Sequence, residues 1–516
     1  MTPLPLAWRA RGAPGGPIFV KHLYVVVGLC AVVIYLGALW NRFAFDDIPI
    51  VLHNPALHAP GAWWRAFASS YWPSELGGGM YRPIPIASYA LDWLVGRAWW
   101  FHGVNVLWHA ATSVAVAALA RRWSGDRAAL AAGLVFAVHP VHVEAVANIV
   151  GRAEVMAALF AILSVYAALI HDRLGWSLLA GACALLSKEN GAVAAGLVAW
   201  GWMVGLARPT RRRMALYVGG WAAVAALYGV VRWLVLQAYA GTYGTAPAFL
   251  GAAPLQIRLT AIAEFADFAR LLVFPLKLRA DYSPAERTLV TSPIDARFAL
   301  GVVCFAVWAA LVWLAWRRGR RVEAFGLGWI GIALMPVANL LFSVGVLVAE
   351  RTLYLPSVGL ALAAGAWLER LAPRRFAAVL TVLVASGGVR AATRVGVWRD
   401  QLTVVLSILE DSPRSFDGPS RMVDIYLMSH QPEKALQAFD AAQRIYRGNP
   451  WLYASGADAA FALGRPPLAD SMLARLSFLC AHCAYYLRYE AVMARARGDS
   501  AVAESLLSRL PALTAQ

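Results

Sequence analysis

Charged residues are scarce in this chain, and cysteines are few. Only 15% of the 516 residues are Asp, Glu, Lys or Arg, whereas 60% are hydrophobic. Soluble globular proteins carry more charge, so this composition excludes a soluble globular fold and predicts an all-α protein that crosses a membrane many times. The five cysteines are too few for a disulfide framework. For Cys480 and Cys483, either a local disulfide or two free packing thiols fits the spacing.

Acidic residues are outnumbered by basic ones. The 46 Lys and Arg residues against 29 Asp and Glu residues give a net charge of +17, and much of it lies in short Arg clusters between apolar runs. Such clusters are typical of the cytoplasmic loops of membrane proteins and not of a face that binds nucleic acid. We therefore expect membrane lipids, and no nucleic acid, among the partners.

The apolar runs and the basic clusters predict about eleven transmembrane helices. Because Lys and Arg mark the cytoplasmic side, the N-terminus is predicted inside and the C-terminal tail outside. No cleavable signal peptide is evident, so the first run is expected to stay as an anchor. The predicted spans are residues 22–40, 104–120, 128–146, 152–170, 174–187, 190–206, 214–237, 297–316, 324–346, 354–369 and 376–391.

The segment 238–296 is the ambiguous part of this topology. Residues 255–274 are apolar enough to suggest a further span, but they carry four charged residues. That pattern suits a helix lying in the membrane interface. A crossing here would also move the next Arg cluster to the outer side, so the segment is predicted to lie outside.

After Arg394 the long apolar runs stop and a repeat begins. Ala435, Ala469 and Ala503 are 34 residues apart, a period typical of tetratricopeptide repeats. An ordinary helical bundle with coincidental spacing is the alternative. The sequence predicts two domains, a transmembrane domain over 1–394 and a short tetratricopeptide-repeat domain over 395–516. Stacked repeats provide a concave groove for peptides or extended chains.

Two adjacent acids, Asp46 and Asp47, directly follow the first apolar run. Carboxylates at the end of a membrane helix are costly to dehydrate, which makes them candidates for a function. A solvated loop pair that marks a helix end is the alternative. Further polar motifs fall on the same predicted outer side. They are, in chain order, Tyr81-Arg82-Pro83, His139-Pro140-Val141-His142-Val143-Glu144, Gly151-Arg152-Ala153-Glu154, Ser187-Lys188-Glu189-Asn190, Asp281-Tyr282-Ser283 and Glu350-Arg351-Thr352-Leu353-Tyr354-Leu355-Pro356-Ser357.

This ordered series resembles the transmembrane and tetratricopeptide-repeat O-mannosyltransferase family, within the C-type glycosyltransferase superfamily. The resemblance covers most of the chain, from the Phe-Asp-Asp loop to Val397-Trp398-Arg399-Asp400 and the repeats. The chain departs from the family in its short array of about three repeats, and in Asn190 where Gln is expected. Its abundant Ala, Arg, Gly and Trp suggest a bacterial member.

The resemblance implies a C-type glycosyltransferase-like membrane domain that transfers a sugar at the outer face. The donor would be a polyprenyl-phosphate sugar, mannose or another hexose, and the acceptor a hydroxyl group, with protein Ser or Thr as the expected acceptor. No nucleotide-phosphate loop is present, so a nucleotide-sugar donor has no support. Either Asp46 or Asp47 would be the catalytic base. Donor binding would fall to Arg82, Arg152, Lys188, Arg351 and Tyr354, because cations meet the charge on the leaving phosphate.

The cations have an alternative role, which is pairing with neighbouring acids or contact with lipid headgroups. Supporting polar roles fall to His139, His142, Glu144 and Glu154. His139, His142 and Glu144 are also the candidates for a divalent metal site, and hydrogen bonding around the site is the alternative.

The expected partners are a lipid-linked sugar donor and an exported protein or peptide that the repeats select. The expected location is the inner (cytoplasmic) membrane of a bacterium, with a cytoplasmic N-terminus and a periplasmic or extracellular repeat domain. Two other readings stay open, a lipid-linked glycan ligase or oligosaccharyltransferase and a non-catalytic membrane scaffold with peptide-binding repeats. A transporter is disfavoured, because transporters place their charges at the membrane midplane.

Overall fold

The computed structural model describes residues 17–73, 78–237, 246–282, 284–480, 484–496 and 498–508. Every regular element in these ranges is a helix, which confirms the predicted all-α class. Within the described ranges, six helices are long and apolar enough to cross a membrane, judged by length and composition alone. These helices are His22–Trp40, Ala98–Ala137, Ile149–Leu169, Arg211–Leu236, Ala296–Arg317 and Pro373–Trp398. The larger predicted number of crossings stays a prediction.

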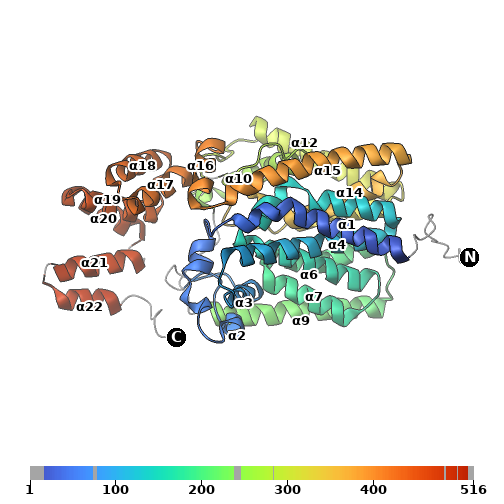
Figure 1. The fold of residues 1–516 in the computed structure, drawn as a ribbon, viewed down its shortest axis with the longest axis horizontal. Helices are drawn as coiled ribbons and strands as arrows, with labels where there is room; N and C mark the ends of the chain where they lie inside the picture. Colours follow the sequence, from blue (N-terminus) through green and yellow to red (C-terminus); the bar gives the residue numbers. More distant parts are fainter. Residues whose placement is uncertain are drawn as a thin grey trace, which may run out of the picture.

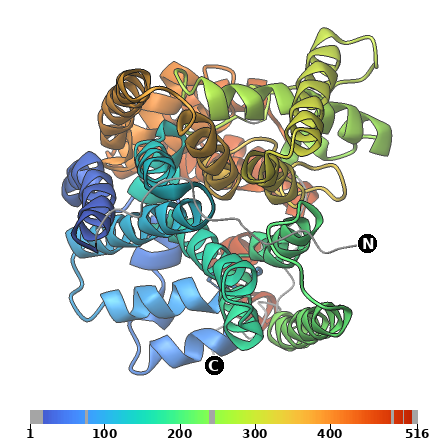
Figure 2. The ribbon, with the colours of Figure 1, turned by 90° about the vertical axis from the view of Figure 1, so that its right-hand side faces the viewer.

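The long helices lie side by side in one bundle, and most of the tail helices lie beyond one end of it (Figure 1). Seen from the other end, the bundle helices are viewed nearly along their axes (Figure 2). The bundle contains α1 (Pro17–Tyr35), α4 (Ala98–Ala137), α6 (Arg152–Leu169), α7 (Leu174–Ser187), α8 (Val193–Met203), α9 (Arg211–Leu236), α12 (Ala296–Arg317), α13 (Arg321–Leu334), α14 (Tyr354–Leu368) and α15 (Pro373–Val395).

Three of the predicted spans differ from the structure in length or separation. The spans 104–120 and 128–146 are joined in α4, with a break at Gly125, whose φ of 86° and ψ of −173° are not helical. Helix α4 ends at Ala137, before the predicted end at 146. Helix α13 ends at Leu334, before the end of the predicted span 324–346. Each helix ends shortly before a proline. Proline removes a backbone donor and clashes with the preceding turn, so neither helix continues as predicted.

The ambiguous segment contains two short helices, α10 (Pro254–Ala263) and α11 (Phe265–Val273). They have 10 and 9 residues, which is far too short for either to cross a bilayer alone. The interface position predicted for this segment stays a prediction.

Small residues let the helices of the bundle approach closely. A Cβ atom on Gly326 of α13 would lie 2.4 Å from the carbonyl oxygen of Gly359 in α14, so neither position has room for a side chain. Beside this contact, the buried indole of Trp329 donates a hydrogen bond of 2.9 Å to the carbonyl of Leu355. Close packing through glycine, with an interhelical hydrogen bond, is a common way to hold helices together in lipid.

The charged residues separate into two groups at the helix ends. The basic clusters predicted to face the cytoplasm contact one another, through pairs such as Arg213 with Asp172 and Arg370 with Glu323. The motifs predicted to face outside meet at helix ends close to the tail, as described below. The structure therefore supports a bundle with two chemically different ends, while its orientation in the membrane stays a prediction.

The tail begins with α16 (Gln401–Asp411) and continues as three helix pairs. The pairs are α17 (Asp417–Met428) with α18 (Pro432–Ile445), α19 (Pro450–Ala462) with α20 (Pro466–Cys480), and α21 (Ala484–Ala496) with α22 (Ser500–Ser508). Ala435, Ala469 and Ala503 lie in the second helix of each pair, and all three are fully buried. Cys480 is disulfide-bonded, and Cys483 lies outside the described residues.

The turns inside the three pairs repeat with the same period. His430, Gly464 and Gly498 are 34 residues apart and have positive φ angles of 54°, 65° and 88°. Glycine adopts this left-handed conformation without strain, whereas histidine does so at a cost. The 34-residue period in the sequence is therefore also a period in backbone conformation.

Gly464→Ala is expected to destabilise the second pair by about 1 kcal/mol, because a Cβ atom disfavours the left-handed turn. No atom lies within 4 Å of the added Cβ, so the cost comes from the backbone alone. Hydrogen exchange of α19 and α20 in the full-length protein measures it. His430→Gly is the matched control, and it should not speed exchange in α17 and α18. Equal effects of both substitutions would contradict this explanation.

Candidate functional site

The loop that carries the two acids begins after the short helix η1 (Leu36–Trp40). The carboxylate of Asp47 is 1% exposed and accepts three backbone hydrogen bonds. The donors are the N–H groups of Val150 at 2.8 Å, Ile149 at 3.3 Å and Ala44 at 3.4 Å. Asp47 therefore anchors the acid loop to the turn before α6.

Burial raises the pKa of Asp47 to about 7, although the three N–H donors act in the opposite direction. The neighbouring charge of Asp46 raises it slightly further. Asp46 itself is half-buried and makes no side-chain hydrogen bond to the described residues. Of the two acids, Asp46 is the one whose carboxylate is available to a substrate.

Three of the four predicted cations pair with acids near Asp46. Arg82 contacts Glu189 at 2.8 Å, Lys188 pairs with Glu154, and Arg351 pairs with Glu144. Each pair joins segments distant in the chain, with 107, 34 and 207 positions between the partners. These groups lie at or beside helix ends: before α3 (Pro83–Asp92), in α5 (Val143–Ala147), at the start of α6, at η8 (Glu189–Ala192) and in η10 (Glu350–Leu353).

The pairs are close enough for their charges to influence one another. Burial lowers the pKa of Lys188, Glu154 opposes this effect, and Arg82 and Arg351 lower the pKa further. Burial also acts to lower the pKa of Arg351, but Glu144 and then Asp46 outweigh it and raise the pKa. We call this set the polar cluster: Asp46, Arg82, Glu144, Glu154, Lys188, Glu189 and Arg351.

Arg152 lies apart from the polar cluster in a buried network. It is 0% exposed, and its guanidinium contacts Asp92 at 2.5 Å and Asn105 at 2.6 Å. Further hydrogen bonds go to the Ser88 hydroxyl at 3.0 Å and the Phe101 carbonyl at 2.9 Å. The whole guanidinium fork is engaged inside the protein, which is the geometry of a structural role, and the predicted donor-binding role stays a prediction.

Tyr354, His139 and His142 are also buried against protein groups. The Tyr354 hydroxyl contacts His109 Nδ1 at 2.8 Å, and His142 Nε2 contacts the Ser357 hydroxyl at 2.6 Å. His139 Nε2 lies 3.0 Å from the Leu272 carbonyl, and burial lowers the His139 pKa to about 4. A contact of Tyr354 with the donor is therefore not supported by its surroundings.

The predicted metal ligands have different partners. Glu144 is engaged by Arg351, while His139 and His142 contact the protein groups given above. Across the described part of the chain, no three His, Cys, Asp or Glu side chains are grouped so as to hold a metal ion.

The sequence prediction missed two residues around the polar cluster, Arg232 and Arg421. Arg232 in α9 is 39% exposed and lies 3.7 Å from Glu189, which also contacts Arg82. A lone cation in an apolar span is a signal that could have identified it. Arg421 in α17 lies over the ring of Phe45, with 3.7 Å from Cζ to the ring centroid. Nothing in the sequence pattern indicates that Arg421 lies against Phe45.

No protein-family model matches the chain. The chain is similar to protein O-mannosyl-transferase TMTC4 of Homo sapiens, with 29% identity over 476 residues, covering 75% of this chain and 62% of that protein. TMTC3 of Homo sapiens is 25% identical, and the match covers 76% of this chain and 48% of that protein. The Caenorhabditis elegans protein O-mannosyl-transferase F38B6.6 is 26% identical, covering 76% and 58%.

The chain is thus similar, over about three quarters of its length, to several protein O-mannosyl-transferases. This finding confirms the family resemblance carried by the motifs. The chain spans less than two thirds of the length of these curated relatives.

Solved structures also resemble the fold at low identity. One is the Archaeoglobus fulgidus oligosaccharyltransferase tethered with an acceptor peptide, with 13% identity and a TM-score of 0.40, covering 95% of this chain and 72% of that chain. Another is ArnT from Cupriavidus metallidurans bound to undecaprenyl phosphate, with 14% identity and a TM-score of 0.41, covering 96% and 79%.

Arg152→Met is expected to lower the stability in detergent by about 3–5 kcal/mol, because it leaves the Asp92 carboxylate buried without its cation. Thermal unfolding measures the loss. Arg213→Met is the control, since its pair with Asp172 is exposed to solvent and should contribute little to stability. Unchanged stability of Arg152→Met, together with weaker binding of a lipid phosphate, would restore the donor-binding role.

Proposed function

We propose that the chain is a membrane glycosyltransferase that moves a hexose from a polyprenyl-phosphate donor to a protein hydroxyl. Mannose and a Ser or Thr acceptor are the choices that the relatives support. The observation that carries this proposal is the polar cluster. The charge of its half-buried Asp46 acts on Arg351, and the charges of Arg351 and Arg82 act on Lys188. We place the cluster at the periplasmic face of a bacterial inner membrane.

Asp46 is the proposed general base. The acceptor hydroxyl oxygen attacks the anomeric carbon of the sugar, and its proton passes to the Asp46 carboxylate. The bond from that carbon to the phosphate oxygen breaks, and the lipid phosphate leaves with the electron pair. Asp47 cannot serve equally well, because its carboxylate already accepts three backbone hydrogen bonds.

The cations of the polar cluster are proposed to bind the donor phosphate. Arg82, Lys188 and Arg351 come from three separate segments, so they can surround an anion, and charge on the leaving phosphate increases during the reaction. Their paired acids hold the long side chains in place before the donor binds. Arg232 at the edge of the cluster adds an exposed cation from α9.

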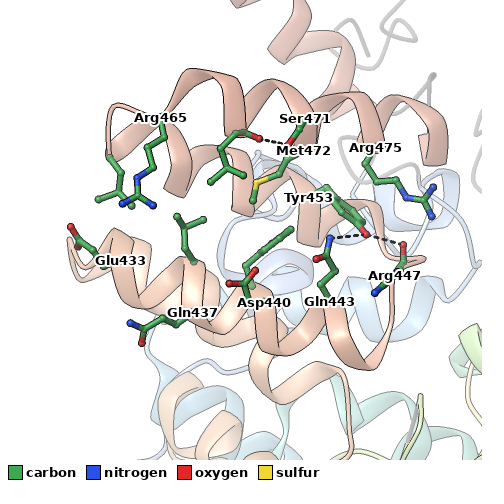
Figure 3. A pocket seen from close by; sticks show the side chains of 14 residues that line it. Glu433, Gln437, Asp440, Gln443, Arg447, Tyr453, Arg465, Ser471, Met472 and Arg475 are labelled. Atoms are coloured by element: carbon green, nitrogen blue, oxygen red, sulfur yellow. Dashed lines mark hydrogen bonds between the residues drawn. The ribbon is translucent and has the colours of Figure 1, made fainter.

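The tail is proposed to bind the protein acceptor, as a short tetratricopeptide-repeat array. A groove of about 920 Å³ lies between α18 and α20, the second helices of two neighbouring pairs (Figure 3). Phe439 and Met472 supply apolar surface, Asp440 lies on the α18 side, and Arg465 and Arg475 lie on the α20 side. Such a groove suits an extended peptide with apolar residues and charges of both signs.

Asp46→Asn is expected to lower sugar transfer about 10²–10⁴-fold, the usual loss when a general base is removed. The assay follows labelled mannose from a polyprenyl-phosphate donor to a Ser- and Thr-containing peptide. Thermal stability should not change, because the Asp46 side chain has no hydrogen bond to lose. Asp47→Asn is the matched control and should lower stability as well as transfer. Near-normal transfer by Asp46→Asn would place the base elsewhere.

The pKa of Asp47 also predicts that activity and stability respond oppositely to pH. Between pH 5 and 7 the folded protein keeps this proton while the unfolded chain releases it, so stability should fall as pH rises through this window. Transfer should rise over the same window, because the ionised Asp47 carboxylate accepts most strongly the three N–H bonds that tie the acid loop to the turn before α6. Thermal unfolding and transfer rates measured from pH 5 to pH 8 test this. A stability profile unchanged in Asp47→Asn would contradict it.

A further inference from the structure

The backbone of the acid loop adopts an unusual conformation next to Asp46. Phe45 has a φ angle of 58°, in the left-handed region that bulky residues rarely occupy. Such a conformation persists only when the surrounding structure holds it in place. The contacts of Phe45 therefore show what fixes the position of the neighbouring carboxylate.

The contacts of Phe45 that hold this conformation come from the chain after α15. The Phe45 N–H donates a hydrogen bond of 2.7 Å to Oε1 of Gln401 at the start of α16. The Phe45 ring packs edge-on against Trp398, with 6.3 Å between the centroids. Nearby, the Arg42 N–H donates a hydrogen bond of 2.7 Å to the Arg399 carbonyl.

Arg421 adds a contact from the first repeat helix. Its guanidinium carbon lies 3.7 Å from the centroid of the Phe45 ring, within the range of a cation–π interaction. On the same helix, Asp417 Oδ2 lies 4.0 Å from Arg421 Nε. Burial raises the pKa of Asp417, Arg421 opposes this, and the charge of Asp46 raises it further.

We propose that Arg421 and Gln401 are positioning residues for the proposed catalytic base. Arg421 covers the ring of Phe45 and Gln401 accepts a hydrogen bond from its N–H group, and together they keep the acid loop in the conformation that places Asp46 in the polar cluster. The catalytic part of this inference rests on the proposed function, whereas the bracing of the loop does not. Helix α17 is thus a wall of the active site as well as the first helix of the repeats.

This arrangement links acceptor binding to the chemistry. Helix α18, which packs with α17 in the first pair, forms one side of the proposed acceptor groove, and α17 holds the loop with the base. A chain cut after Arg399 would lose both Gln401 and Arg421. Such a chain is expected to lose transfer to small hydroxyl acceptors as well as to protein acceptors.

The test compares Arg421→Met, Arg421→Lys and Gln401→Ala with wild type, using the full-length protein in detergent or nanodiscs. Lys434→Met is the matched control, because Lys434 lies over the Tyr426 ring in the same helix pair, at 5.8 Å. Hydrogen exchange of residues 41–50 reports the loop directly. Arg421→Met and Gln401→Ala should exchange about tenfold faster there, the change expected for loss of one such contact. Lys434→Met should not.

The activity readout separates positioning from binding. Arg421→Met and Gln401→Ala should lower kcat for mannose transfer about tenfold, with KM for the polyprenyl-phosphate donor unchanged. Arg421→Lys keeps the cation and should recover part of the rate, although it loses the planar stack.

Each outcome bears on one of the two proposals. Unchanged exchange in residues 41–50 of both Arg421→Met and Gln401→Ala overturns the bracing role, whatever the protein catalyses. Equal acceleration in Lys434→Met overturns it too, because the effect would then come from general loosening of the tail. Faster exchange in a protein whose wild type shows no sugar transfer leaves the brace standing and overturns the proposed function.

Discussion

A charge that leaves water must be paired or hydrogen-bonded, and this constraint shapes the site at the tail end of the bundle. An unpaired buried charge costs several kcal/mol, so the acids and bases there are matched across the fold. Arg82 pairs with Glu189, Lys188 with Glu154 and Arg351 with Glu144. These pairs join helix ends that the membrane core alone would leave free to move. Asp46 is the exception, because its carboxylate has no such partner among the described residues.

The two adjacent acids differ because of what lies behind them. Asp47 faces the turn at residues 149–150, where two backbone N–H groups have no helical acceptor, and its carboxylate satisfies both. The charge of Asp46 instead acts on Arg351, whose pKa it raises. One carboxylate therefore holds the loop, and the other has no hydrogen bond to the described residues. Identical side chains acquire separate roles from their surroundings alone.

Local patterns in the sequence predicted much of the fold. The predicted span 174–187 coincides with α7, and the predicted 152–170 ends one residue after α6, because apolar runs between polar turns determine helix length. The acids and cations of the site were also found, since charges at the ends of apolar runs are conspicuous. Their partners could not be predicted. The pairing of Arg351 with Glu144 depends on packing across 207 positions, and no local pattern encodes it.

Arg152 also shows that the sequence does not reveal which polar residues meet in the fold. It stands in a motif with Glu154, two residues along the same helix, and the sequence alone does not show that the two belong to different networks. The two side chains point in different directions around the helix, so Glu154 reaches Lys188 while Arg152 reaches Asp92. Which face enters the cluster depends on how α6 is rotated in the bundle, and that rotation is set by tertiary packing.

The boundary between bundle and tail also depends on packing. Val404 and Ile408 of α16 are buried in the same apolar core as Trp329 and Tyr354 of the bundle, whereas Phe416 begins the core of the repeats. Ser412 and Ser415, between the two cores, hydrogen-bond to Asp281, and Arg394 of α15 pairs with Asp411. The junction is thus tied to the bundle by polar contacts on both sides. A tail attached in this way holds a fixed position over the acid loop, which is the condition for a repeat helix to brace Phe45.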